Sequence, residues 1–212
     1  MQAARGASLS TEAPGGSGAG ARGSHRRLLI GFAIGVVAAW AIDQLTKVWA
    51  VARLEDGDPI RLVPDVLELR FLRNGGAAFG LGDSMTIVLT LIAIGVAVMV
   101  IRLAPRLQDR GWTVALGLLL AGTTGNLTDR LLREPEPLHG HVVDFIDYGG
   151  LFVGNVADIY LTVAAVLILW QSWKGVGLDG LTDTQRGAKT LHRASDDDAD
   201  TDGPSVGDHR GE

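Results

Sequence analysis

Three carboxylates stand among apolar residues in one segment of the chain, HVVDFIDYGGLFVGNVADIY, residues 141–160. They are Asp144, Asp147 and Asp158. Two carboxyl groups that lie close together do not both ionise readily, so one keeps a proton while the other stays charged. The charged group can take a proton from water as it attacks a peptide carbonyl, and the protonated group can polarise that carbonyl. The segment therefore predicts hydrolysis by a pair of carboxylates, a reaction that needs no cofactor.

Other hydrolytic chemistries lack the residues that they require. The chain has no cysteine, which excludes a thiol nucleophile, a disulfide framework and a thiolate metal site. The sequence has no G-x-S-x-G motif for a nucleophilic serine. His139 and His141 form HGH in an expected loop without an H-E-x-x-H pattern, so we expect no metal.

The elements that must position these carboxylates are apolar blocks long enough to cross a membrane. The chain has 212 residues, of which 47% are hydrophobic, and its mean hydropathy is positive. A helix of about 20 residues, rising 1.5 Å per residue, covers the hydrocarbon core. Four blocks fit this description: residues 28–52, 85–104, 112–128 and 151–173. The sequence predicts an all-α membrane protein with four transmembrane helices.

Basic residues predict the orientation of these spans. Arginines and lysines precede the first span, lie between the second and third, and follow the fourth, so these segments are expected to be cytoplasmic. The loops at 53–84 and 129–150 then face outward. Residues 1–25 and 175–212 lack apolar periodicity and are rich in small or acidic residues, which predicts disordered cytoplasmic extensions. Residues 26–174 form the expected ordered domain.

Polar residues are concentrated at one depth of the predicted bundle. Ionisable residues inside spans are costly and suggest function. The first and third spans run outward and the fourth runs inward, so the end of the first two meets the start of the last near the outer surface. The polar residues at these positions are Asp43, Lys47, Asn126, Asp129, Arg130, Asn155 and Asp158. Asp43 and Lys47 are one helical turn apart and are expected to pair.

The outward loop before the second span predicts a small extracytoplasmic β-sheet. In DVLELRFLRNGGAAFG, the apolar residues Leu67, Leu69 and Phe71 alternate with polar ones, which indicates a half-buried strand. A tight turn follows at Asn74-Gly75-Gly76. We expect this sheet to lie over the polar layer with Asn74 at the end of the strand.

Alternative interpretations make different demands on the sequence. SHRRLLIGFAIGVVAAWA also resembles a cleavable signal peptide, although the apolar run continues to Ala52. A transporter or proton channel would place polar residues along the full membrane depth, whereas the second span offers only Thr86 and Thr90 near its outer end. A presenilin-type protease would carry a G-x-G-D motif; GLGD at residues 80–83 has this pattern but lies in the loop before the second expected span, outside the expected spans. A membrane scaffold without activity remains a further alternative.

Five sequence blocks occur in a characteristic order: DQLTK at 43, RNGGAAFG at 73, GTTGNLTDR at 122, VVDFID at 142 and NVADIY at 155. With these blocks, over residues 40–165, the chain resembles the bacterial lipoprotein signal peptidase (signal peptidase II) family. The resemblance implies a membrane aspartic endopeptidase that cuts lipid-modified prolipoproteins just before the diacylglyceryl-cysteine. We expect a monomer in the bacterial cell membrane that contacts membrane lipids, uses no cofactor and binds no nucleic acid.

The resemblance also implies roles for individual residues. Asp144 and Asp158 match the catalytic pair, and Asp147 has no catalytic part. The residues implied to position substrate or support the pair are Asn74, Asn126, Arg130 and Asn155. The residues implied to be structural are Asp43, Lys47 and Asp129. The chain departs from the family pattern by having Gly154 in place of Phe and Ile159 in place of Ser, which bears on the fit of the substrate.

The spacing of the two implied catalytic residues requires a change of chain direction. On one unbroken helix, Asp144 and Asp158 would lie about 21 Å apart, too far to act as a pair. Gly149 and Gly150 between them permit the chain to turn. We therefore expect residues 141–160 to form a loop, a turn and the entry to the fourth span.

Overall fold

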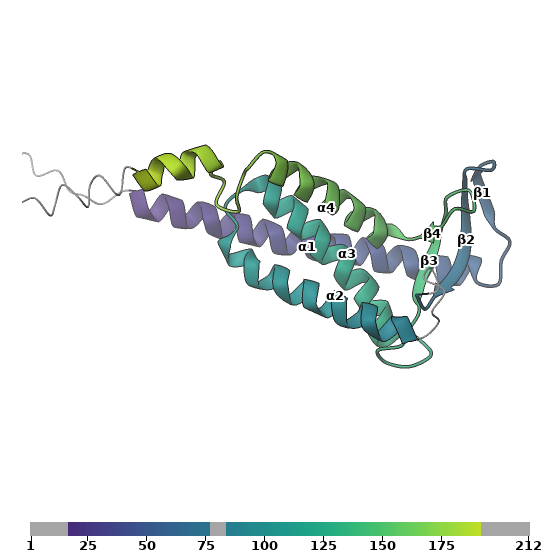
Figure 1. Ribbon diagram of the computed structural model, residues 1–212. Helices are drawn as coiled ribbons and strands as arrows, with labels where there is room; N and C mark the ends of the chain where they lie inside the picture. The colour runs from purple at the N-terminus through teal and green to yellow at the C-terminus, as the bar shows by residue number, and fades with distance from the viewer. Residues whose placement is uncertain (1–16, 77–83, 192–212) are drawn as a thin grey trace, which may run out of the picture.

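The structure is a computed structural model that describes residues 17–76 and 84–191. The long helices lie side by side in an elongated bundle, and a small sheet covers one end of it (Figure 1). The elements in chain order are α1 (Ser17–Leu54), β1 (Ile60–Val63), β2 (Leu67–Asn74), α2 (Ser84–Leu103), the short 3-10 helix η2 (Ala104–Arg106), α3 (Arg110–Leu132), β3 (Val142–Asp147), β4 (Val153–Gly154) and α4 (Val156–Trp173).

Three helical segments of the described chain are long and apolar enough to cross a membrane. They are Gly23–Leu54, Thr86–Arg106 and Val156–Trp173. Helix α3 packs against α1, α2 and α4, but its second half carries Thr, Asn, Asp and Arg side chains, which make it less apolar. The protein is therefore a mostly helical membrane protein with three apolar spanning helices and a fourth helix packed among them.

The fourth expected span begins later than its apolar composition indicates. The prediction of a helix from residue 151 was wrong, because α4 begins at Val156 and the preceding residues form a turn and β4. Asn155 ends the extended segment, and its side chain accepts a hydrogen bond from the backbone N–H of Asp158. This cap starts the helix at a defined residue.

The chain is ordered beyond both ends of the expected domain. Helix α1 already begins at Ser17, inside the range expected to be disordered. Residues 175–191, also expected to be disordered, form turns and a helical segment at 183–191. The physical reason is local packing: Leu178 packs against an apolar cluster, its carbonyl accepts the Gln108 N–H at 2.8 Å, and Trp112 Nε1 donates to the Val176 carbonyl at 2.8 Å. Residues 1–16 and 192–212 lie outside the described residues.

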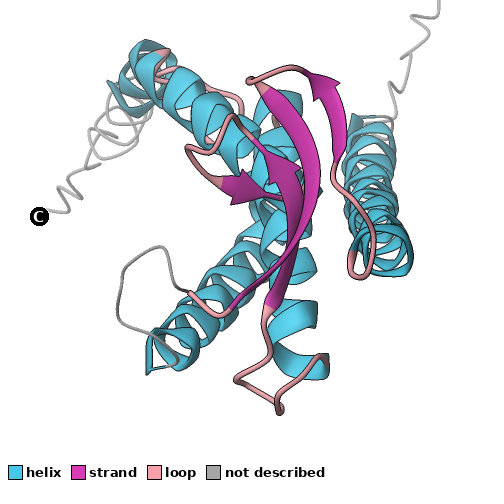
Figure 2. Cartoon of the chain, turned by 90° about the vertical axis from the view of Figure 1, so that its right-hand side faces the viewer, coloured by secondary structure: helices cyan, strands magenta, loops and turns pink. Residues whose placement is uncertain are grey.

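The sheet is antiparallel with strand order β1-β2-β3-β4, and Figure 2 looks along the bundle with the sheet in front of the helices. The small sheet expected from the sequence is confirmed, but only β2 was predicted as a strand. Strands β3 and β4 come from the segment expected to be a loop and turn. In the β2–β3 pairing, Asn74 lies opposite Val142 and Leu72 lies opposite Asp144. This register places Asn74 and Asp144 next to each other across the two strands.

Two contacts fix the position of the sheet and of α4. Val143 and Phe145 of β3 pack with Ala50 and Leu54 at the end of α1, which holds the sheet on the bundle. Helices α3 and α4 approach closely at Gly122, where an added Cβ would lie 2.6 Å from the Ala157 carbonyl oxygen. Only glycine allows this approach, which brings the polar half of α3 against the start of α4.

Candidate active site

Asp144 lies on β3 and is almost completely buried, at 2% exposure. Each of its carboxylate oxygens accepts a hydrogen bond from a side-chain amide. Asn74 Nδ2 on β2 donates to Oδ2 at 2.8 Å, and Asn155 Nδ2 donates to Oδ1 at 2.6 Å. Asp144 therefore has a fixed orientation, set by the strand register on one side and by the start of α4 on the other.

Asp158 lies in the first turn of α4. Its Oδ1 accepts a hydrogen bond from Asn126 Nδ2 on α3 at 2.8 Å, and its Oδ2 accepts the backbone N–H of Asn155 at 3.0 Å. The bond to the Asn155 N–H and the reciprocal bond from the Asp158 N–H to the Asn155 side chain form a capping box. The carboxylate is thus held by the helix terminus itself.

Asn155 connects the two carboxylates. It is fully buried, and its Nδ2 donates to Asp144 Oδ1 and, at 3.2 Å, to Asn126 Oδ1. Its backbone N–H and side-chain oxygen bond Asp158. The structure therefore brings Asp144 and Asp158 to opposite sides of one asparagine, although they lie in different secondary-structure elements. The turn expected between them occurs at Gly149 and Gly150, which both have positive φ angles.

A layer of buried charge lies directly behind Asn126. Lys47 Nζ is 2.9 Å from Asn126 Oδ1, 3.0 Å from Asp43 Oδ2 and 2.8 Å from Asp129 Oδ2, and the three charged side chains are fully buried. The expected pairing of Asp43 with Lys47 is confirmed. Asp43 also accepts the backbone N–H of Ala157 at 2.9 Å, which ties α1 to the first turn of α4.

Two members of this layer were missed by the sequence analysis. Arg133 Nε donates to Asp129 Oδ1 at 2.6 Å, and Gln44 Nε2 donates to Asp43 Oδ2 at 3.0 Å and to the Gly125 carbonyl at 3.1 Å. Arg133 could have been found from its spacing of four residues after Asp129 on one helix. Gln44 has no such signal, because its neighbour across the bundle is a backbone carbonyl.

Arg130 approaches both carboxylates without forming a close ion pair in the described contacts. It interacts electrostatically with Asp144, Asp158 and Asp129. Its Nη1 lies 3.5 Å from the carbonyl oxygen of Asn126, at the limit of a hydrogen bond. The positive charge of Arg130 therefore lies beside Asp144 and Asp158 without a close ion pair to either carboxylate among the described residues.

Burial raises the pKa of Asp144 to about 6, and the negative charge of nearby Asp158 acts in the same direction. The hydrogen bonds from Asn74 and Asn155 and the charge of Lys47 oppose this change. A carboxyl group with a pKa near 6 can hold or release a proton close to neutral pH. Asp144 is therefore suited to proton transfer.

Asp147, the third carboxylate of the segment, is directed to different partners. Its Oδ2 lies 2.9 Å from Arg70 Nη2, and its Oδ1 accepts the Gly150 N–H at 2.7 Å. These contacts belong to the sheet and its turn.

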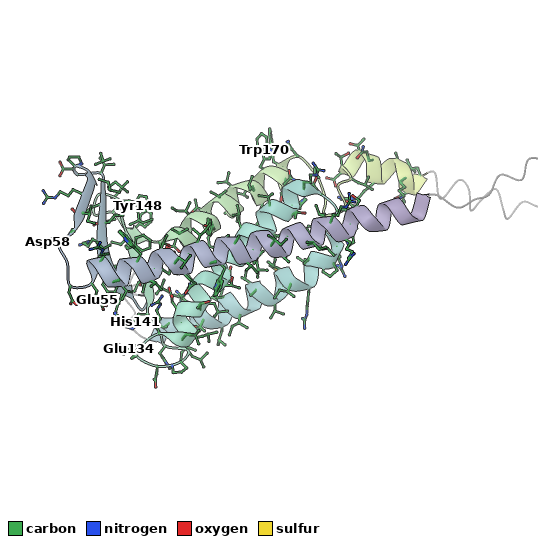
Figure 3. All side chains as sticks on the ribbon, turned by 180° about the vertical axis from the view of Figure 1, so that it is seen from behind. Glu55, Asp58, Glu134, His141, Tyr148 and Trp170 are labelled. Atoms are coloured by element: carbon green, nitrogen blue, oxygen red, sulfur yellow. The ribbon has the colours of Figure 1, made fainter. Side chains whose placement is uncertain are left out.

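Figure 3 labels Glu55, His141 and Tyr148 at the end of the molecule that carries the sheet, and Trp170 toward the opposite end.

Comparison with known proteins gives one family. Residues 35–174 match the family model described as signal peptidase (SPase) II. The lipoprotein signal peptidase of Rhodococcus jostii (strain RHA1) is 44% identical over 168 residues, covering 79% of this chain and 84% of that protein. The lipoprotein signal peptidase of Bifidobacterium adolescentis is 46% identical over 142 residues, covering 66% and 75%.

A solved structure agrees with this comparison. A bacterial membrane enzyme determined by the in meso method at 1.9 Å resolution has a TM-score of 0.58 and 29% identity, covering 68% of this chain and 92% of that chain. The chain has the multiple apolar helices that such a membrane enzyme requires. Together, the family match and the relatives show that this chain belongs to the signal peptidase II family of bacterial membrane aspartic peptidases.

Proposed function

We propose that this protein removes signal peptides from diacylglyceryl-modified prolipoproteins by hydrolysing the peptide bond that precedes the lipidated cysteine. Its relatives are named lipoprotein signal peptidases, and the family model matches most of the chain. The observation that carries the catalytic proposal is the link through Asn155, which holds Asp144 and Asp158 as one unit.

In this mechanism, Asp158 is the base and Asp144 carries the proton. Each oxygen of Asp158 accepts one N–H hydrogen bond and has capacity for a second, which a water molecule can fill. Asp144 is assigned the proton because burial and the adjacent charge raise its pKa to about 6. The two carboxyl groups thus begin the reaction with one proton between them.

The reaction proceeds by water attack and two proton transfers. Asp158 removes a proton from water, the water oxygen bonds to the carbonyl carbon of the residue before the lipidated cysteine, and Asp144 donates its proton to the carbonyl oxygen. Asp158 then gives the proton that it gained to the cysteine nitrogen, and the C–N bond breaks as Asp144 recovers its own proton from the collapsing intermediate. Both carboxyl groups end in their starting states.

The surrounding residues support this exchange. Asn74, Asn126 and Asn155 hold the carboxylate oxygens in fixed directions, and the Lys47 layer keeps Asn126 in place. Arg130 supplies positive charge beside the pair, where it can stabilise the negative charge that develops on the substrate carbonyl oxygen before Asp144 protonates it. Asp43 and Asp129 serve structure, since their oxygens are occupied by Lys47 and other donors.

The same proposal includes the placement of the enzyme in the membrane. Helix α3 completes a bundle of four spans, both termini are cytoplasmic, and the sheet with the carboxylate pair lies at the outer leaflet. Arg102 in the last turn of α2 and Arg106 in η2 support this orientation, because they lie at the end of the bundle opposite the sheet. The enzyme acts as a monomer, and the substrate's lipid chains lie against the spans within the bilayer.

The decisive experiment is cleavage of a diacylglyceryl-modified prolipoprotein by the purified full-length protein in lipid, with an unlipidated precursor as the substrate control. Asp144→Asn and Asp158→Asn should each abolish cleavage at normal membrane levels. Asp147→Asn is the matched control, because Asp147 bonds Arg70 and the adjacent turn, and it should remain active. Cleavage by either Asp144→Asn or Asp158→Asn would refute the proposed pair.

A further inference from the structure

Two threonines form a buried polar face on an otherwise apolar helix. Thr86 and Thr90 lie in the first turns of α2 and are 1% and 0% exposed, whereas Leu91 beside them is 60% exposed. Residues four apart share one face of a helix, so the threonine face points into the protein. A buried hydroxyl without a partner is costly. The partners of these hydroxyls therefore show what this face of α2 contacts.

Thr86 Oγ1 donates to the carbonyl oxygen of Gly75. Thr86 is in the first turn of α2, so the helix offers it no carbonyl four residues back, the usual acceptor for a helical threonine. Gly75 directly follows Asn74, whose Oδ1 accepts the Gly76 N–H at 2.9 Å and whose Nδ2 donates to Asp144 Oδ2 at 2.8 Å. Thr86 thus fixes the Gly75–Gly76 peptide, whose N–H is bonded to the Asn74 side chain.

Thr90 contacts the other segment that leads to Asp144. Its Oγ1 is 2.7 Å from the Thr86 carbonyl oxygen and 3.2 Å from the Leu138 carbonyl oxygen. Leu138 has a φ of 73°, in the left-handed region, and lies in the connection from α3 to β3. The threonine face of α2 therefore contacts both the end of β2 and the chain that enters β3, the two strands that carry Asn74 and Asp144.

We propose that Thr86 is a positioning residue for the carboxylate pair: through the Gly75 carbonyl it holds the Asn74 amide against Asp144, while Thr90 fixes the entry to β3. This inference rests on the proposed function of Asp144. Neither threonine contacts the carboxylate pair directly: Thr86 bonds the Gly75 carbonyl, and Thr90 bonds the Thr86 and Leu138 carbonyls. Helix α2 thereby contributes to the site, although none of the residues predicted from the sequence to form the site lies on it.

The consequence for proton transfer follows from the direction of the Asn74 hydrogen bond. This bond stabilises the charged form of Asp144 and so lowers its pKa against the effect of burial. A misplaced Asn74 would leave the pKa of Asp144 higher. The other groups that act on Asp144 remain in place: Lys47 of α1, Arg130 of α3, the N-cap residue Asn155 and Asp158 in the first turn of α4.

The test compares Thr86→Val, which keeps the shape and removes the donor, with Thr86→Ser, which restores a hydroxyl. In the full-length enzyme in lipid, Thr86→Val should lower kcat about 10-fold with KM changed by less than about 2-fold, because misaligned catalytic groups slow the chemical step. Thr86→Ser should recover most of the rate. Thr113→Val is the matched control: within the described part of the chain, the Thr113 hydroxyl bonds the Asp109 carbonyl at the end of α3 away from the site, so kcat should not change.

A second readout does not depend on activity. Infrared titration of the Asp144 carboxyl group, assigned by its loss in Asp144→Asn, should show a midpoint raised by about 0.5 to 1 pH unit in Thr86→Val. Thr86→Ser and Thr113→Val should keep the midpoint of the unsubstituted enzyme. An unchanged midpoint in Thr86→Val, or equal behaviour of Thr86→Val and Thr86→Ser, would overturn the inference. Cleavage by Asp144→Asn would instead overturn the proposed function, whatever the titration shows.

Discussion

Replacing Lys47 with methionine tests whether the buried layer is held together by charge. Lys47 is fully buried between Asp43, Asp129 and Asn126, at 2.8 to 3.0 Å from each. With Arg133 on Asp129, the layer contains two positive and two negative groups and is neutral. Lys47→Met leaves one uncompensated buried negative charge. Removing one partner of a buried ion pair typically costs about 3 to 5 kcal/mol.

The structure indicates where that cost falls. Asp129 keeps Arg133 at 2.6 Å, so the uncompensated charge rests mainly on Asp43, which retains only the Ala157 N–H and the Gln44 amide. The loss should therefore be near the lower end, about 3 kcal/mol. At about 2 to 4 °C per kcal/mol, the thermal midpoint in detergent should fall by about 6 to 12 °C.

A second substitution separates charge from packing. Lys47→Met with Asp43→Asn restores a neutral layer and should recover at least half of the lost thermal midpoint, because no buried charge is left without a partner. Thermal unfolding of both variants in the same detergent, followed by circular dichroism, gives the comparison. Equal midpoints for the single and double variants would refute the electrostatic account, since the loss would then come from the packing of the lysine stem.

Three further outcomes follow from the structure. Gly125→Ala should reduce cleavage at least about 10-fold, because its Cβ would lie 2.5 Å from Asp43 Oδ2, whereas Gly117→Ala, with no contact under 3.6 Å, should have normal cleavage rates. The raised pKa of Asp144, about 6 against 3.8, means that the folded state keeps its proton to a higher pH than the unfolded state does, so this group lowers the free energy of unfolding by about 3 kcal/mol as pH rises from about 3 to about 7. Asp144→Asn should flatten that slope in thermal unfolding scans at each pH, and an unchanged slope would contradict the assignment. Trp112→Phe removes a 2.8 Å hydrogen bond to the C-terminal segment and should cost about 1 kcal/mol of stability with cleavage rates unchanged, measured by unfolding and precursor cleavage.

The polar layer of the site could be predicted from the sequence because its members are exceptions in apolar surroundings. Asp43, Lys47 and Asn126 stand out within or at the ends of expected spans, and alternating span directions bring them to one depth. The structure confirms that they are in direct contact. Their function as supports for catalysis remains a prediction, since contact alone does not measure activity.

The strand that carries Asp144 was not predicted, and its burial explains why. Most of VVDFID is buried, so the strand lacks the alternation of apolar and polar residues that marks a half-buried strand. The strand pairs with β2, whose pattern does alternate, and only that partner was recognised. The sequence also gave no reason to connect Thr86 with Asn74, because Thr86 bonds the backbone carbonyl of Gly75. Every residue has a backbone carbonyl, so such a contact leaves no pattern of residue types in the sequence.

The ordered C-terminal segment shows a different limit of sequence reasoning. Residues 175–191 were expected to be disordered because they belong to the segment from Gly175 onward, which carries an acidic run and late Gly and Pro residues. Leu178 packs against an apolar cluster, its carbonyl bonds the connection between α2 and α3, and the Val176 carbonyl accepts the Trp112 Nε1–H, so these contacts anchor the segment. Amino-acid composition describes the average character of a segment and does not indicate which individual residues contact the bundle.

The start of α4 makes folding and turnover interdependent. Asp158, the proposed base, is also the N3 residue of the capping box with Asn155. Its carboxylate therefore stabilises the first turn of the helix on which it lies. In the proposed cycle, each protonation of Asp158 weakens its acceptor role toward the Asn155 N–H, and the first turn of α4 loses part of a contribution of about 1 kcal/mol. Every catalytic cycle therefore loosens and tightens one helix end by a small, reversible amount. Glutamate, the common residue at that capping position, would preserve the cap but displace the reacting oxygen, so helix stability alone cannot select the residue at this position.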